Sequence, residues 1–447
     1  MPCARIVLLR SNPMERLRGF LRNATDALSE RDFRLLWIGQ TGSFFGDALV
    51  GVALAFAVLG LTGSAGDLGL VFAAFALPRV IFILAGGVWS DRLPRQRVMV
   101  ACDLLRAAVQ GVMSTLLITG SAEIWHLIAF AMLMGSAAAF FTPASVGLMP
   151  QIVSPARLQQ ANALVSISQS GTHIFGPLLA GLMVATVGPG WAFAVDGASF
   201  LVSAGFLLAM RVPPRDVPAR RPFIAELAEG WREVVSRSWV VACILTFSIS
   251  NISLAAFQVL GPLIADRELG GASAWGIVAA GASIGGVAGA AVALRWKPDR
   301  PLIPAFLVML LAQIELLLLV PPFPALVVAM GAFVTIASIV ISNTLWDTML
   351  QQHIPRDALS RVSSYDWMVS LIFLPIALAV VGPLAESIGV RETLLVAALI
   401  GLLANSAVLL VPSVRNLRRR EDANPAEPAK AAAAAADPTD PPLATSV

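Results

Sequence analysis

Long apolar segments constrain this chain of 447 residues more than any other feature of its sequence. A helix needs about 20 apolar residues to cross the hydrocarbon core of a bilayer, where only helices and closed barrels satisfy every backbone polar group. Such segments recur roughly twelve times, which predicts an all-α membrane protein with twelve transmembrane helices. The expected spans are 36–61, 68–89, 98–120, 124–147, 163–187, 191–210, 239–264, 274–294, 302–320, 324–349, 362–384 and 393–411.

The composition agrees with a chain embedded in lipid and argues against several other classes of protein. Hydrophobic residues make up 57% and charged residues 13% of the chain, whereas soluble domains carry about 25% charged residues. The 3 cysteines and 3 histidines show no metal-ligand spacing, and neither lysine lies in a phosphate-binding Gly-x-x-x-x-Gly-Lys pattern. We therefore expect no metal, no cofactor and no nucleic-acid partner. The expected partners are the lipid bilayer, a small-molecule substrate and a coupling ion.

The placement of basic residues predicts the orientation of the spans. With both termini inside, 27 of the 31 lysines and arginines fall in cytoplasmic segments, and the external loops hold only Arg267 and Arg391. Cytoplasmic loops of membrane proteins carry such an excess of positive charge. We therefore expect a multi-pass protein of the plasma (inner) membrane with both termini in the cytoplasm.

The chain divides into two related halves. Gly176-Pro177-Leu178 recurs as Gly382-Pro383-Leu384, and Met149-Pro150-Gln151 recurs as Met349-Leu350-Gln351, at equivalent places in the two sets of six spans. Two pseudo-symmetric six-helix halves are typical of transporters with parallel repeats. The expected organisation is a basic cytoplasmic N-terminal segment at 1–35, a first half at 36–210, a cytoplasmic linker at 211–238, a second half at 239–412 and a disordered tail at 413–447.

The short loop between the second and third spans carries a recognisable pattern. Gly87 and Asp91 are followed by Arg92, Arg95 and Arg97 at the membrane surface. This pattern resembles the signature loop between helices 2 and 3 of the major facilitator superfamily. An ordinary basic loop would explain the arginines but not Gly87 and Asp91 at this spacing. The resemblance implies a gating network in which Asp91 joins Arg95, Asp103 and Arg106.

A second motif, Gly176, Pro177 and Gly181 in the fifth span, resembles the Gly-Pro motif of exporters in that superfamily. Proline bends a helix and glycine lets a neighbouring helix approach. The resemblance implies a bend that seals the bundle, whereas simple helix packing is the alternative. The opening segment Arg31–Gln40 is similar to the exporter branch that includes the enterobactin exporter and macrolide efflux proteins. In the eighth span, Gly281, Gly285 and Gly289 predict a close helix contact.

Charged residues inside spans are the best candidates for a proton or substrate site, because burying them in a bilayer is costly. The candidates are Asp47, Arg79, Asp196 and Glu315. Asp47 and Arg79 fall near the middle of adjacent spans, so we expect a pair that forms in one state and parts in another. Asp103 and Arg106 are spaced for an ion pair on one helix, and His173 is expected to be a packed histidine.

These observations together predict a secondary active transporter that exports a small drug- or siderophore-like amphipathic molecule by proton antiport, with alternating access. A facilitator or importer on the same fold is the first alternative. A polytopic membrane enzyme is a remote one, since the sequence shows no catalytic constellation.

Overall fold

A computed structural model describes residues 26–212 and 231–419 of the chain, without the side chains of 83–92 and of six positions between 356 and 364. All regular structure in these residues is helical. Twelve of the helices are long and apolar enough to cross a membrane. The predicted fold class and number of spans are therefore confirmed.

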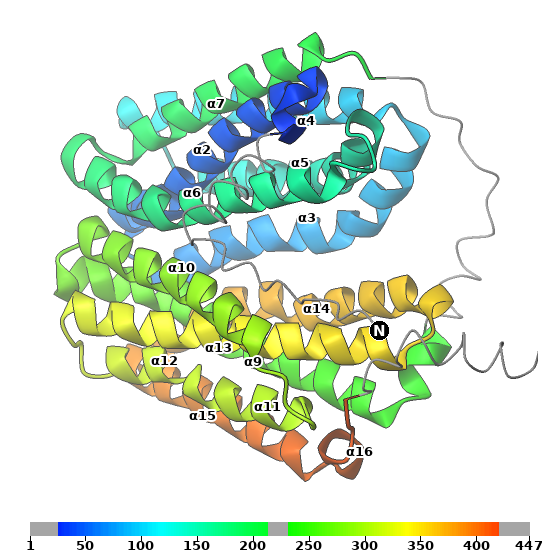
Figure 1. Ribbon diagram of the computed structural model, residues 1–447. Coiled ribbons are helices and arrows are strands. Elements are labelled where there is room, and N and C mark those ends of the chain that lie inside the picture. The colour runs from blue at the N-terminus through cyan, green and yellow to red at the C-terminus, as the bar shows by residue number, and fades with distance from the viewer. Residues whose placement is uncertain (1–25, 213–230, 420–447) are drawn as a thin grey trace, which may run out of the picture.

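The helices form two bundles, which lie one above the other in Figure 1. The first half begins with a short turn, η1 (Ala27–Ser29), and the second half ends with η3 (Val408–Leu410) and α16 (Pro412–Arg415). The first bundle contains α2 (Arg31–Thr62), α3 (Ala65–Arg92), α4 (Arg95–Ile118), α5 (Ile124–Ile152), α6 (Leu158–Val187) and α7 (Pro189–Ala209). The second contains α9 (Ser238–Ile264), η2 (Ala265–Leu269), α10 (Ala272–Arg295), α11 (Leu302–Leu311), α12 (Ile314–Leu319), α13 (Ala325–His353), α14 (Arg356–Ile388) and α15 (Val390–Ala407).

The two bundles repeat the same pattern of helix neighbours. In the first, α3 packs on α5, α2 on α7 and α2 on α6; in the second, the equivalent pairs are α10 with α13, α9 with α15 and α9 with α14. Between the halves, α3 packs on α14 and α6 packs on α10. These two crossings are also equivalent, because each joins the second span of one half to the fifth span of the other. The pseudo-symmetry suggested by the repeated sequence motifs is thus present in the packing.

The contact between α10 and α13 confirms the glycine face predicted in the eighth span. Side chains at Gly281, Gly285 and Gly289 would each overlap a backbone oxygen of α13; a Cβ on Gly281, for example, would lie 2.6 Å from the oxygen of Ala329. Backbone atoms cannot rotate away as side chains can. Only glycine therefore lets the two helices approach so closely.

The ninth span differs from the single helix expected at 302–320. It is broken into α11 and α12 at Ala312 and Gln313, where the backbone hydrogen bonds tighten to the i−3 carbonyls. Thr335 on α13 donates a hydrogen bond of 3.2 Å to the oxygen of Ala312. A freed carbonyl in a lipid-embedded helix needs such a partner, so α13 stabilises the break.

The chain ends also differ from the expected boundaries. The first span starts at Arg31 and not at residue 36. The predicted tail at 413–447 begins with ordered residues, because α16 buries Val414 completely and Arg419 donates a backbone hydrogen bond to Asp299. Residues 1–25, most of the linker at 211–238, and residues 420–447 lie outside the described part of the chain.

Candidate functional site

One end of the molecule, here called the closed end, brings the two halves into contact. It carries the turns at Gly63, Gly188 and Gly389. There α3 crosses α14 with glycine on both sides: a Cβ at Gly69 would overlap the oxygen of Leu378, and one at Gly382 would overlap the oxygen of Ala65. The crossing is therefore a contact of backbone against backbone.

The equivalent crossing of α6 and α10 uses the predicted Gly-Pro motif. A Cβ on Gly181 would lie 2.5 Å from the oxygen of Ala272, and one on Gly276 would lie 2.6 Å from the oxygen of Pro177. Gly176 faces the other way, against Ala48 of α2. The motif thus packs α6 tightly against both neighbours, as both a sealing role and simple helix packing would require.

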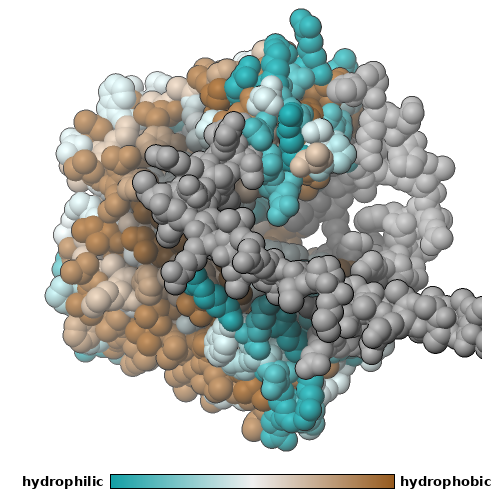
Figure 2. Space-filling model, viewed as in Figure 1, coloured by the Kyte–Doolittle hydropathy of each residue, from teal (hydrophilic) through white to brown (hydrophobic). Residues whose placement is uncertain are grey.

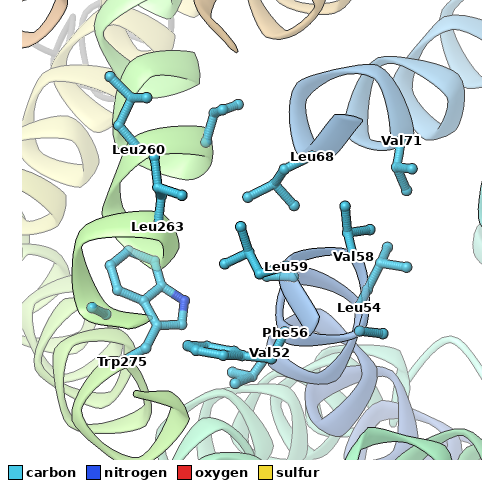
Figure 3. Packing of buried hydrophobic residues seen from close by; sticks show 14 of the residues in the cluster. Val52, Leu54, Phe56, Val58, Leu59, Leu68, Val71, Leu260, Leu263 and Trp275 are labelled. Atoms are coloured by element: carbon cyan, nitrogen blue, oxygen red, sulfur yellow. The ribbon is translucent and has the colours of Figure 1, made fainter. Parts of the chain in front are cut away.

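An apolar cluster fills the space between these two crossings. Figure 3 shows Leu59 and Phe56 of α2 and Leu68 of α3 facing Leu263 of α9 and Trp275 of α10. All five side chains are buried, and they come from both halves of the molecule. This cluster excludes water from the closed end.

Polar contacts fix the rim of the same end. Glu386 of α14 accepts hydrogen bonds from Ser64 Oγ (2.8 Å) and from the backbone nitrogen of Gly66 (3.1 Å), at the start of α3. Arg267 donates a hydrogen bond of 3.0 Å to the oxygen of Gly63. Each of these bonds joins one half to the other.

The opposite end, here called the open end, carries Arg31, Ala209 and Arg415. Hydrophilic residues gather at this end, and the space-filling surface is hollowed between the halves there (Figure 2). The inter-half contacts of the described residues lie between the closed end and the middle of the helices, as far as Ser283 of α10, which donates to the oxygen of His173. Among the described residues, the contacts named above thus gather towards the closed end, and the hollow lies at the opposite end.

A polar cluster lies inside the first half, near the middle of its helices. Asp103 and Asp196 are completely buried, and Gln110 donates a hydrogen bond to Asp196 Oδ2. Arg106 is 7% exposed, with its guanidinium 4.7 Å from the ring centroid of Phe141 and 5.2 Å from that of Phe200. These side chains come from α4, α5 and α7, so packing of the three helices assembles the cluster.

The predicted ion pair of Asp103 with Arg106 does not form in this structure. Ser203 lies near Asp103, but neither carboxylate oxygen meets hydrogen-bond geometry with a described residue, and Arg106 Nε is also buried without a partner. The guanidinium lies over aromatic rings from α5 and α7 instead. Spacing on one helix allows the pair, but long-range packing has turned Arg106 towards the rings. Buried polar atoms without partners are uncommon. They occur at other described positions in both halves, but Asp103, Arg106 and Gln110 bring four of them together here.

Asp47 lies on α2 beside this cluster, and its partners differ from the prediction. The ionisable groups in electrostatic range of Asp47 are Arg106, His173, Asp103 and Asp196. Arg79, its expected partner, is an exposed residue of α3. Asp47 and Arg79 therefore do not pair in this state, and a pair that forms in another state stays a prediction. His173 is also not packed away, because its side chain is exposed on α6.

The other candidate carboxylates are deeply buried. Close packing of α2 on α7 fixes Asp196, because a Cβ on Gly46 would overlap its carboxylate. Glu315 is 2% exposed on α12 in the second half, where Gly331 of α13 packs against its backbone. The structure thus brings Asp196 close to Asp47 in the first half and places Glu315 in the interior of the second half.

The signature loop is described only in part. The side chains of Gly87, Asp91 and Arg92 lie outside the described residues, so the predicted gating network remains a prediction. Arg95 donates a hydrogen bond to the oxygen of Gly147, near the end of α5, where a cation is favourable. Arg97 is exposed.

The same open end carries a contact that the sequence did not suggest. Glu30 accepts hydrogen bonds from Ser154 Oγ (2.7 Å) and from Arg157 Nη1 (3.2 Å), and so ties the start of α2 to the turn between α5 and α6. The hydrogen bonds from Ser154, with the nearby Arg157, hold the pKa of Glu30 below its ordinary value.

A cavity of about 410 Å³ opens beside Asp47, between α2, α5 and α6. Volumes of this size hold drug-sized ligands in many proteins. Gln40 donates a hydrogen bond of 2.6 Å to Ser145 in its wall. The lining residues are Gln40, Phe44, Phe141, Thr142, Ser145, Val146, Met149, Pro150, Leu158, Asn162, Val165 and Gln169. No lysine, arginine, aspartate or glutamate is among them, so neutral polar and apolar groups form the wall.

Sequence reasoning missed the neutral members of this site. Gln40, Gln110 and Gln169 each lie inside an apolar span, where a side-chain amide needs a hydrogen-bond partner or access to water. Their position within the spans was the available signal. A criterion based on charge alone does not detect these neutral side chains.

Comparison with known proteins agrees with this architecture. The Major Facilitator Superfamily matches residues 36–370. The chain therefore belongs to that superfamily of membrane transporters.

Among relatives, the chain is 27% identical over 389 residues to the multidrug efflux pump Tap of Mycolicibacterium fortuitum, covering 83% of this chain and 93% of that protein. It is 23% identical over 395 residues to macrolide efflux protein A of Streptococcus pyogenes, covering 87% and 96% of the two chains. The fold is similar to that of the nucleoside transporter NupG, with a TM-score of 0.68, 12% identity and coverage of 86% and 99%. It is also similar to a bacterial homologue of the human lysosomal transporter Spinster in an inward-facing conformation, with a TM-score of 0.67, 15% identity and coverage of 91% and 98%.

Proposed function

We propose that this protein is a secondary active exporter that moves a small amphipathic molecule out of the cell by proton antiport and alternating access. The relatives named as multidrug and macrolide efflux proteins support export of drug-like molecules. Their alignments extend over most of the chain.

The observation that carries the proposal is the one-sided opening of the cleft. Both inter-half crossings, the apolar cluster around Trp275 and the bonds of Glu386 lie towards the closed end. The cavity beside Asp47 is lined by α2, α5 and α6 of the first half. Rocking of the two halves about the middle of the helices would break these contacts and open the other end. A substrate held in the cavity would then change sides.

The proposed orientation places the open end in the cytoplasm. The start of α2 and the short helix α16 lie at that end, as do the end of α7 and the start of α9, which border the linker (Figure 1). The basic residues of the sequence concentrate in the same segments, as cytoplasmic segments do. In this orientation the cavity faces the compartment from which an exporter loads its substrate.

The proposed proton site is Asp47, the carboxylate of the polar cluster that is exposed. Its electrostatic neighbours come from other helices: Arg106 and Asp103 from α4, His173 from α6 and Asp196 from α7. A carboxylate that changes its neighbours between two states also changes its affinity for a proton. An antiporter needs this property, because proton release on one side must be linked to substrate movement.

Inverted membrane vesicles that contain the full chain test this proposal. An imposed outward-directed proton gradient, with the vesicle lumen acidic, should drive accumulation of a macrolide antibiotic or of ethidium, and a protonophore should abolish it. Asp47→Asn should keep downhill exchange and lose accumulation against a gradient. A well-folded Asp47→Asn protein that still accumulates substrate would remove Asp47 from the coupling mechanism. Asp266→Asn, which changes an exposed carboxylate at the closed end, is the matched control.

A facilitator or importer on the same fold is the second candidate. The structurally similar proteins include a nucleoside transporter, so this fold alone does not determine the direction of transport. In the vesicle assay, a facilitator would equilibrate the substrate without responding to the proton gradient. An importer would deplete it from inverted vesicles.

A further inference from the structure

Two stripes of residues, one on α2 and one on α6, include cavity-lining residues and continue beyond the cavity described above. On α2, residues 40, 44, 47 and 51 are spaced by four, three and four positions and share one face of the helix. On α6, residues 162, 166, 169 and 173 have the same spacing. Gln40, Phe44, Asn162 and Gln169 line the cavity, so Asp47 and His173 extend the same two faces.

The rise of an α-helix places Asp47 and His173 just beyond the cavity wall. Asp47 lies three residues past Phe44, which is about 4.5 Å along α2, and His173 lies four residues past Gln169, about 6 Å along α6. Both side chains are exposed. Asp47 and His173 are also in electrostatic range of each other. The neutral cavity therefore leads to a carboxylate and an imidazole at its inner end.

Arg106, the cationic member of the cluster, is covered by aromatic rings. Arg106 is 7% exposed and lies over the ring of Phe141, which itself lines the cavity. A molecule entering the cleft meets the exposed carboxylate of Asp47, while the guanidinium is covered by aromatic rings. On these faces of α2 and α6, His173 is the other exposed ionisable group.

We propose, building on the export function above, that the transported substrate is a lipophilic cation whose positive charge binds at Asp47 and whose apolar body fills the cavity. Phe44 and Phe141 offer aromatic faces that attract cations. The amides of Gln40, Asn162 and Gln169 can hydrogen-bond to neutral polar groups of varied substrates. An anion of the same size finds no exposed arginine or lysine in this wall.

Tetraphenylphosphonium and tetraphenylborate provide a direct test, because they have nearly the same shape and opposite charge. Saturable binding of each ion to the purified full chain is measured by equilibrium dialysis, with the excess unlabelled ion defining specific binding. We expect the cation to bind at least about tenfold more tightly than the anion, as one charge contact supplies. Equal binding of both ions by the wild-type protein would overturn the proposal.

Variants locate the charge selectivity. Asp47→Asn should reduce cation binding about tenfold and leave anion binding unchanged, whereas Asp47→Glu should retain the preference. Asp266→Asn removes an exposed carboxylate at the closed end and should bind as the wild type does. If Asp47→Asn does not fold, Phe44→Leu should still weaken cation binding several-fold through the lost aromatic face. Full cation binding in a folded Asp47→Asn protein contradicts the assignment.

The export function and the preference for cations can be refuted independently of each other. Cation binding that depends on Asp47, without movement of any substrate across vesicles, would contradict the export function and support the site. Proton-driven export of a macrolide by a protein that binds both tetraphenyl ions equally would overturn the charge selectivity and leave the export function standing.

Discussion

The glycine crossing of α3 and α14 allows a prediction about the balance between the two states of the transporter. In Gly382→Ala, the added Cβ would overlap the oxygen of Ala65 and lie 2.6 Å from the Cα of Gly66. Ordinary contact requires 3.4–4 Å. The contacted atoms are backbone and cannot rotate away, so the two helices must separate by about 1 Å.

This separation costs free energy in the state that has the closed end shut. Overpacking of a tight interface costs about 1–3 kcal/mol. The penalty disappears when the halves part at this end, because Ala65 and Gly382 belong to different halves. Gly382→Ala should therefore shift the equilibrium towards the alternative state by roughly 5- to 150-fold.

Distance measurements between spin labels check this shift. Labels at Ser121 and Pro322, in exposed turns of the two halves at the closed end, should report a longer distance in Gly382→Ala than in the wild type. Gly111→Ala is the matched control, since a Cβ there meets nothing within 4 Å. The reasoning is refuted if a folded Gly382→Ala protein gives the same distance distribution as Gly111→Ala.

Three further predictions concern other parts of the chain. Asp91→Asn should slow efflux at normal membrane levels, because loss of a charged hydrogen-bond acceptor weakens a gating network; unchanged efflux in vesicles would argue against the network. Reporter fusions in the linker at 211–238 and at Gly270 should show opposite sidedness, and equal sidedness would refute the topology. Glu30→Gln should lower the melting temperature slightly at pH 7. Because the pKa of Glu30 is lower in the folded protein, this difference should fade as pH falls below about 4; a pH-independent difference in thermal scans would contradict that origin.

The fold could be predicted from the sequence because its main determinants are local. The length of each apolar segment determines whether it spans the bilayer, and the placement of arginines predicts orientation without reference to packing. The glycine face of α10 was predictable for the same reason, since helical periodicity places Gly281, Gly285 and Gly289 on one side. The helix break at Ala312 was not, because neither glycine nor proline marks it and its partner Thr335 is distant in sequence.

The site was predicted less well because its contacts depend on how whole helices rotate and pack. Asp47 and Asp196 were identified as candidates from their position inside spans, and the structure places them in one cluster with Arg106. Their partners were not predicted, because Arg106 on α4 reaches Phe141 and Phe200 only after α5 and α7 have packed around it. Adjacent spans suggested Arg79 as a partner for Asp47, but adjacency in sequence does not determine which faces meet.

The location of Asp47 also explains why movement of the halves should change the neighbours of this carboxylate and not those of the buried acids in the second half. Asp366 is held within that half by Trp346 and Ser370, and rocking leaves such partners in place. Asp47 instead faces α6, whose His173 carbonyl accepts a hydrogen bond of 2.6 Å from Ser283 of α10 across the interface. When α6 and α10 part, this bond breaks beside the carboxylate. The hydrogen bond that joins the halves thus ends on His173, an electrostatic neighbour of Asp47. Opening of the closed end can therefore change the surroundings of Asp47 directly.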